Sequence, residues 1–199
     1  MGYNTFMNYD RLLDQAKHEL AQNPFDIAHD YAHHLSVYEN CIQIVSSEKL
    51  KVDLNALALA AWLHDYQRDK EKARNEFVRK IVKENKITRE FAEKVIKIIN
   101  SHSYGNEQLF EEQKVLFDAD KLEYVSVSRL NLVILAVETG KLSREAWQRY
   151  GKAWLERTHP VHNLLHYEIS KKLYAKRAQE FLSFIKHDTR LNELSDIMI

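Results

Sequence analysis

The stretch LNALALAAWLHD, residues 54–65, decides the fold. Apolar side chains occupy almost every position from Leu54 to Leu63, so they surround the helix axis and do not form one stripe. A helix that is apolar on nearly all sides has no face to present to water and lies in the centre of a domain. Asp53 can cap its start. We therefore predict a central helix from Leu54 to Asp65.

Working outward, the rest of the chain predicts further helices. Only four Gly and two Pro occur in 199 residues, fewer than a sheet protein of this size needs for its turns. Apolar residues recur at helical spacing. They predict helices over 9–22, 30–49, 112–137 (broken, or two in succession), from Thr88 onward, from Ser143 to Arg157 and from Pro160 to about 186, with a short helix or a frayed end over 188–199.

The charge-rich segment 67–86 predicts a solvated helix, or else a lid over a site. We find no internal repeat, low-complexity run or linker. The predicted fold class is therefore all-α, with a single helical domain over residues 1–199.

Charge and cysteine content narrow the function classes. The 29 basic and 29 acidic residues give a formal net charge of zero, so no broad basic field is available for nucleic acid or for an anionic membrane. No run of about 18 apolar residues predicts a membrane span, and the N-terminus lacks the apolar core of a signal peptide. The single cysteine, Cys41, fits a reducing compartment. We expect a cytoplasmic protein.

The central helix ends in an adjacent histidine and aspartate, His64 and Asp65. An aspartate at the end of a buried helix is costly unless it is paired or bound to a cation. By itself this pair also fits a surface position at a helix end. Two other segments place a histidine and an aspartate on apolar faces. Together, the three segments favour a bound cation over a surface pair.

His33 lies four residues before Val37, so both share one face of the predicted helix 30–49. Asp120, in LFDADKLEY at 116–124, lies three residues after Phe117 on another apolar face. Taken alone, a histidine such as His33 is more often a hydrogen-bonded core residue than a metal ligand. His33, His64, Asp65 and Asp120 would satisfy one another by sharing a cation.

Three segments, HDYAHHLSV (29–37), AAWLHD (60–65) and DADKLEY (118–124), together resemble the HD-domain superfamily of metal-dependent phosphohydrolases, in particular small bacterial HD hydrolases. The family motif is a histidine on one helix, an adjacent His-Asp pair on a second and an aspartate on a later one. The motif-bearing core then spans about 25–186.

The resemblance implies a ligand set of His33, His64, Asp65 and Asp120. His34 is the rival first ligand, but the HDxxH spacing favours His33. Two imidazoles and two carboxylates suit one divalent ion of Mn, Fe, Co, Ni or Zn. Such an ion can activate a water for attack on phosphorus. We expect a small phosphorylated substrate, either a nucleotide or another phosphate ester, and the resemblance also suggests a homodimer.

Candidate catalytic residues surround these ligands. Besides Asp65 itself, Arg68 could clamp a phosphate, Asp69 could act as a base or orient water, and His102 could touch phosphate or donate a proton. Lys121 follows the last aspartate and could reach the substrate. Apart from Asp65, each of these also fits a residue with a purely structural or solvated place.

Several alternatives stay open. Dinuclear-iron oxygenases of the superfamily need two further histidines between the His-Asp pair and the last aspartate, and this chain has only His102 there. Relatives that hydrolyse ppGpp carry a Glu-Asp pair where HDYQRD, residues 64–69, has arginine before aspartate.

A non-catalytic metal- or nucleotide-binding regulatory module is the main rival function. His159, His162 and His166 offer a second metal site, or else a cluster at the surface or core edge.

Overall fold

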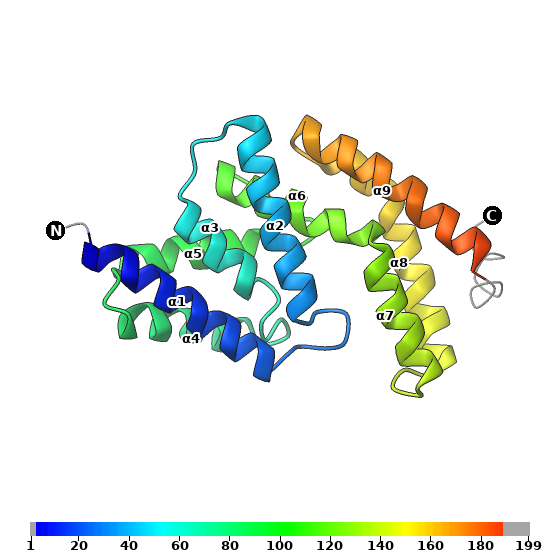
Figure 1. The fold of residues 1–199 in the computed structure, drawn as a ribbon, viewed down its shortest axis with the longest axis horizontal. Coiled ribbons are helices and arrows are strands. Elements are labelled where there is room, and N and C mark those ends of the chain that lie inside the picture. The colour runs from blue at the N-terminus through cyan, green and yellow to red at the C-terminus, as the bar shows by residue number, and fades with distance from the viewer. Residues whose placement is uncertain (1–2, 189–199) are drawn as a thin grey trace. The chain divides into compact units, whose positions relative to one another are not determined.

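The computed structural model describes residues 3–188, apart from the side chains of 3–7, Tyr150, Leu155 and His159. Within that range the chain consists of nine α-helices, one 3-10 helix and their connections, and no strand occurs there (Figure 1). The all-α prediction is confirmed. The end of the chain, where a short helix or fraying is predicted, lies outside the described residues from 189 onward. None of the described helices is both long and apolar enough to span a membrane.

The chain divides into two compact units, the first ending at Asp120 and the second beginning at Lys121. The expectation of one domain over residues 1–199 stays a prediction. The helices of the first unit, with α6 ending at the boundary, are α1 (Tyr3–Gln22), α2 (Tyr31–Glu48), α3 (Leu54–Leu63), α4 (Glu71–Glu84), α5 (Arg89–Ser101) and α6 (Glu111–Lys121).

Helix α3 is the centre of the first unit, as its sequence predicts. It packs against α1, α2 and α5, and every residue from Ala56 to Leu63 is buried (Figure 1). The carboxylate of Asp53 caps α3 by accepting from the backbone N–H of Ala56 at 3.1 Å. Because all its faces are covered, α3 can hold the side chains at its end in fixed positions.

Side-chain caps start the neighbouring helices where the sequence predicts them. Asp30 caps α2 and Thr88 caps α5, each accepting from the backbone N–H three residues ahead. Helix α2 ends at Glu48, and Lys49, which follows it, is in the left-handed conformation with φ of 53°. The caps matter for the site because the Asp30 cap fixes the first turn of α2, which carries His33.

Two predictions about the middle of the chain need correction. Helix α3 ends at Leu63, two residues before the predicted end, and residues 64–69 form a turn in which Gln67 has a φ of 45°. The segment predicted to be solvated does form α4, but its face of Arg74, Val78, Ile81 and Val82 is buried, because α4 packs against α5 and α1.

The second unit contains η1 (Leu122–Val125), α7 (Val127–Glu138), α8 (Arg144–Leu164) and α9 (Glu168–His187). The prediction that Pro160 opens the last helix is wrong, because Pro160 lies inside α8 and α9 begins at Glu168. A proline inside a helix removes one backbone hydrogen bond. Helix α8 packs against α9, where the Trp154 and Phe181 rings lie 5.6 Å apart and the Tyr174 hydroxyl donates to the Thr158 carbonyl at 2.7 Å.

Candidate metal centre

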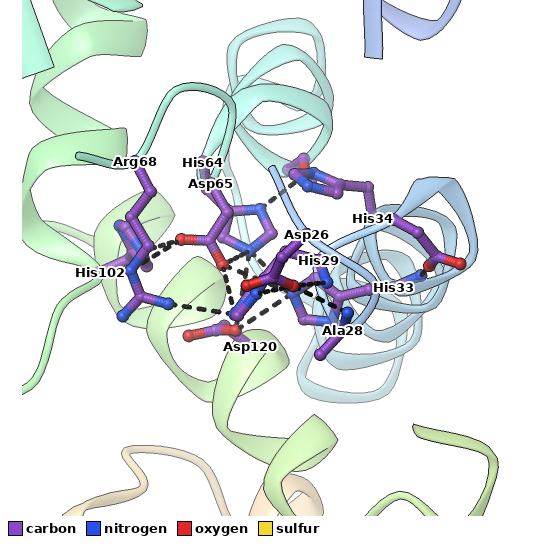
Figure 2. A network of polar contacts seen from close by, with 12 residues as sticks. Asp26, Ala28, His29, His33, His34, His64, Asp65, Arg68, His102 and Asp120 are labelled. Atoms are coloured by element: carbon purple, nitrogen blue, oxygen red, sulfur yellow. Dashed lines mark hydrogen bonds and ion pairs between the residues drawn. The ribbon is translucent and has the colours of Figure 1, made fainter. Parts of the chain in front are cut away.

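Four buried side chains meet in the first unit, His33 from α2, His64 and Asp65 from the end of α3, and Asp120 from α6 (Figure 2). One nitrogen or oxygen atom from each lies within 4.8 Å of the others. They are the four residues that the sequence predicts as ligands. The structure therefore brings together segments that lie as far apart in the chain as positions 33 and 120.

The spacing of the donor atoms fits a single ion. Nε2 of His33 lies 3.2 Å from Nε2 of His64, and both nitrogens lie 3.6 Å from Oδ1 of Asp120. Oδ2 of Asp65 lies 3.4 Å from Nε2 of His64. Two ligands about 2.1 Å from one ion at a right angle would be about 3.0 Å apart, and slightly farther at a tetrahedral angle. These distances match ligands that share an ion.

The backbone fixes which nitrogen of His64 faces the cluster. Nδ1 of His64 lies 2.9 Å from the carbonyl oxygen of Ala61, which can only accept, so Nδ1 carries the proton and donates. The lone pair of the neutral ring is then on Nε2 and points toward the other donors. An outer hydrogen bond of this kind is how proteins orient histidine ligands.

Helix α6 is anchored beside α2 by one buried contact. Nδ2 of Asn40, on α2, donates to the carbonyl oxygen of Ala119 at 3.1 Å. This bond holds the backbone next to Asp120. Two imidazole nitrogens and two carboxylates form a donor set for a borderline divalent transition metal, so the residues fit the expected ion.

Charge within the cluster changes the pKa values of its members. Burial lowers the pKa of His64, but the carboxylates of Asp65 and Asp120 outweigh burial and raise it to about 9. Burial raises the pKa of Asp65, but His64, His102 and His33 hold it well below its ordinary value. A cluster that stabilises a positive charge so strongly on one of its own rings is also suited to stabilise a metal cation.

Metal binding is expected to release a proton at neutral pH. Without metal, His64 is protonated below about pH 9, whereas a metal ligand must be neutral. Apparent affinity for Mn²⁺ should therefore rise between pH 6 and pH 8, by about tenfold per pH unit for each proton released. Calorimetry at pH 7 in buffers of different ionisation enthalpy measures the proton count. Equal heats in all buffers, with an affinity that does not change with pH, would contradict this expectation.

The predicted catalytic residues have different places. Arg68 and His102 lie beside the cluster, with Nε of Arg68 and Nε2 of His102 each 3.4 Å from Oδ1 of Asp65. His102 is buried, and its Nδ1 donates to the carbonyl of Ile99, while burial lowers its pKa.

Asp69 is exposed in the turn before α4, and among the described residues no contact joins it to the cluster. Its proposed role as a base gains no support. Lys121 begins the second unit, where its ammonium lies 5.4 Å from the centre of the Tyr124 ring. Its reach toward a substrate stays a prediction.

The rival first ligand, His34, is buried, and its ring packs against the ring of His64 with the centroids 4.6 Å apart. Its Nδ1 lies 3.3 Å from the carbonyl of Ala61, and it is not one of the four residues whose donor atoms converge. Of the predicted second metal site, His162 and His166 are exposed, and the side chain of His159 is not described. Among the described residues the first cluster alone groups three or more such donors.

Sequence reasoning missed two residues that support the site. Arg74, on α4, is buried and donates to the backbone carbonyl of His64 at 3.1 Å and to Oδ1 of Asn100 at 2.8 Å. Its position four residues before Val78, on an apolar stripe, could have marked it as inward-facing. The second is Asp26, whose carboxylate accepts from Nδ1 of His29 beside the cluster. It also accepts from the backbone N–H of Ala28, two residues ahead, and an aspartate in a loop is a weak sequence signal for such a turn.

Comparisons with known proteins agree with this geometry. A family profile described as HD domain matches residues 30–125, a range that includes all four converging residues. A comparison with curated proteins gave no match.

Solved structures share the fold. A predicted HD superfamily hydrolase from an uncultured Thermotogales bacterium is 23% identical, with a TM-score of 0.61 over 89% of this chain and 88% of that one. An HD-superfamily hydrolase from Bacillus thuringiensis is 17% identical, with a TM-score of 0.62 over 89% and 93%. Bacillus subtilis YpgQ, solved in complex with ADP, is 21% identical, with a TM-score of 0.62 over 87% and 94%. Residues 30–125 therefore match the HD domain profile, and the chain shares the fold of solved HD superfamily hydrolases.

Proposed function

We propose that this protein is a metal-dependent phosphohydrolase that cleaves a nucleotide or another small phosphate ester with a water activated at the cluster of His33, His64, Asp65 and Asp120. One observation carries the proposal, namely the convergence of two imidazoles and two carboxylates in a buried site within 4.8 Å. An ion bound there supplies positive charge for the phosphoryl oxygens and lowers the pKa of water.

The protein's own residues supply the rest of the chemistry. Arg68 lies next to Asp65 with its side chain 41% exposed, so its guanidinium can meet a phosphate that arrives from solvent. Nε2 of His102 lies 3.4 Å from Oδ1 of Asp65, so this ring lies beside the cluster. The buried surroundings of the cluster strengthen each of these electrostatic interactions, because water screens them less.

The likeness to solved HD superfamily hydrolases supports hydrolysis as the reaction class. The ADP in the YpgQ structure supports a nucleotide as the substrate class, because that protein has the same fold. Zero net charge and the absence of a broad basic field fit a small phosphorylated substrate better than a nucleic acid.

The test is a substrate panel with defined metal. Protein stripped with chelator and reloaded with Mn²⁺, Co²⁺, Ni²⁺, Zn²⁺ or Fe²⁺ is assayed against nucleoside mono-, di- and triphosphates and sugar phosphates. We expect release of phosphate or pyrophosphate from at least one class, lost in chelator and restored by metal. Stoichiometric metal binding with no turnover of any phosphate compound would favour the non-catalytic metal-binding module instead.

A further inference from the structure

The loop before α2 carries a hydrogen-bonded pair, Asp26 and His29. Oδ1 of Asp26 accepts from the backbone N–H groups of Ala28 at 2.7 Å and His29 at 2.9 Å, and from Nδ1 of His29 at 2.8 Å. An ionised carboxylate only accepts, so the proton of the His29 ring is on Nδ1. Asp26 therefore selects the tautomer in which Nε2 of His29 is the acceptor.

That acceptor faces Arg68 (Figure 2). Nη1 of Arg68 lies 3.1 Å from Nε2 of His29, and a guanidinium only donates, so the tautomer set by Asp26 is the one that Arg68 requires. Nε of Arg68 lies 3.4 Å from Oδ1 of Asp65. The guanidinium is thus held at two points, by His29 and by Asp65 of the metal cluster.

The side chains of this chain of contacts differ in exposure, and that of Asp26 is 45% exposed. The side chain of Asp65 is 2% exposed, that of His29 is 15% exposed and that of Arg68 is 41% exposed. The hydrogen bond to His29 engages one of the five N–H donors of the guanidinium. Arg68 is therefore both tied to the cluster and reachable from solvent, where a phosphate would approach.

We propose that Asp26 and His29 are positioning residues, which hold the Arg68 guanidinium in the orientation that binds a phosphoryl group of the substrate. The inference rests on the proposed function, since it assigns the partners of a phosphate-binding arginine at that site. An arginine side chain loses much rotational freedom when it binds a ligand, and holding it beforehand reduces that loss. His29 acts through Arg68 and needs no contact with substrate.

The experiment measures binding, so it does not depend on turnover. Calorimetry gives the affinity of Mn²⁺-loaded protein for methylenediphosphonate, a diphosphate analogue that is not hydrolysed, in wild type, His29→Leu, His29→Gln, Arg68→Leu and the double variant with both leucines. We expect His29→Leu to weaken binding by about tenfold, the low end of the range for outer-partner losses. His29→Gln, which keeps a side-chain acceptor, should recover most of the affinity.

The double variant shows whether His29 acts through Arg68. We expect it to bind no more weakly than Arg68→Leu alone, because the function of His29 is already lost. Bound manganese should stay at one ion per chain in every variant. The inference would be overturned if the two losses of affinity multiplied in the double variant. Loss of manganese from His29→Gln would also overturn it, and so would a wild type that does not bind the diphosphonate. A wild type that binds it but hydrolyses no phosphate compound would instead defeat the proposed function alone.

Discussion

His33→Asn is expected to abolish stoichiometric metal binding, whereas His34→Asn is expected to keep one ion per chain. The two histidines are adjacent on α2, but His33 presents Nε2 to the cluster and His34 presents Nδ1 to the carbonyl of Ala61. The amide of asparagine can replace a hydrogen bond made by Nδ1 but does not reach the position of Nε2. The substitution therefore removes a ligand at one position and preserves a contact at the next.

Metal content by plasma mass spectrometry, after reloading with Mn²⁺ and desalting, measures this difference. Activity of His33→Asn on any substrate found should fall by more than about 100-fold, beyond the range for an outer hydrogen-bond partner. His64→Ala and Asp65→Ala should lose metal and activity together. Full metal content in His33→Asn, with loss in His34→Asn, would show that the rival histidine is the ligand.

Leu59→Ala is expected to lower the free energy of unfolding by about 2–5 kcal/mol, the usual cost of emptying part of a packed core. Leu59 lies in the middle of α3 and is 0% exposed, and α3 packs against α1, α2 and α5. Leu54→Ala on the same helix is the matched control, since Leu54 is 50% exposed. Its change should stay within about 0.5 kcal/mol.

Urea unfolding of the full chain in chelator, followed by circular dichroism and Trp fluorescence, measures both variants. Chelator removes the stabilisation that bound metal would add. An effect of Leu59→Ala no larger than that of Leu54→Ala would contradict the central place of α3.

Much of the fold was predictable because its signals are local. The apolar run of α3, its cap at Asp53 and the helix start at Thr88 each act within one or two turns of helix, and the structure confirms them. The errors in the predicted helix bounds arise where contacts between residues far apart in the sequence determine where a helix begins or ends. The chemistry of Pro160 favours a helix start, but the structure continues α8 through Pro160, and α8 packs against α9.

The candidate site shows the same division. Three separated segments with donors on apolar faces predicted the meeting of His33, His64, Asp65 and Asp120, because buried charge needs a partner. The link from Asp26 through His29 to Arg68 depends on two loops meeting in space. A contact between two loops produces no periodic pattern in the sequence, so it could not be predicted from one.

Anomalous X-ray diffraction from crystals grown with Mn²⁺, collected above and below the metal absorption edge, tests the central claim most directly. The account predicts one strong peak per chain, about 2.0–2.3 Å from a nitrogen or oxygen of each of His33, His64, Asp65 and Asp120. A chain with no such peak, or with its only peak bound elsewhere, would contradict it.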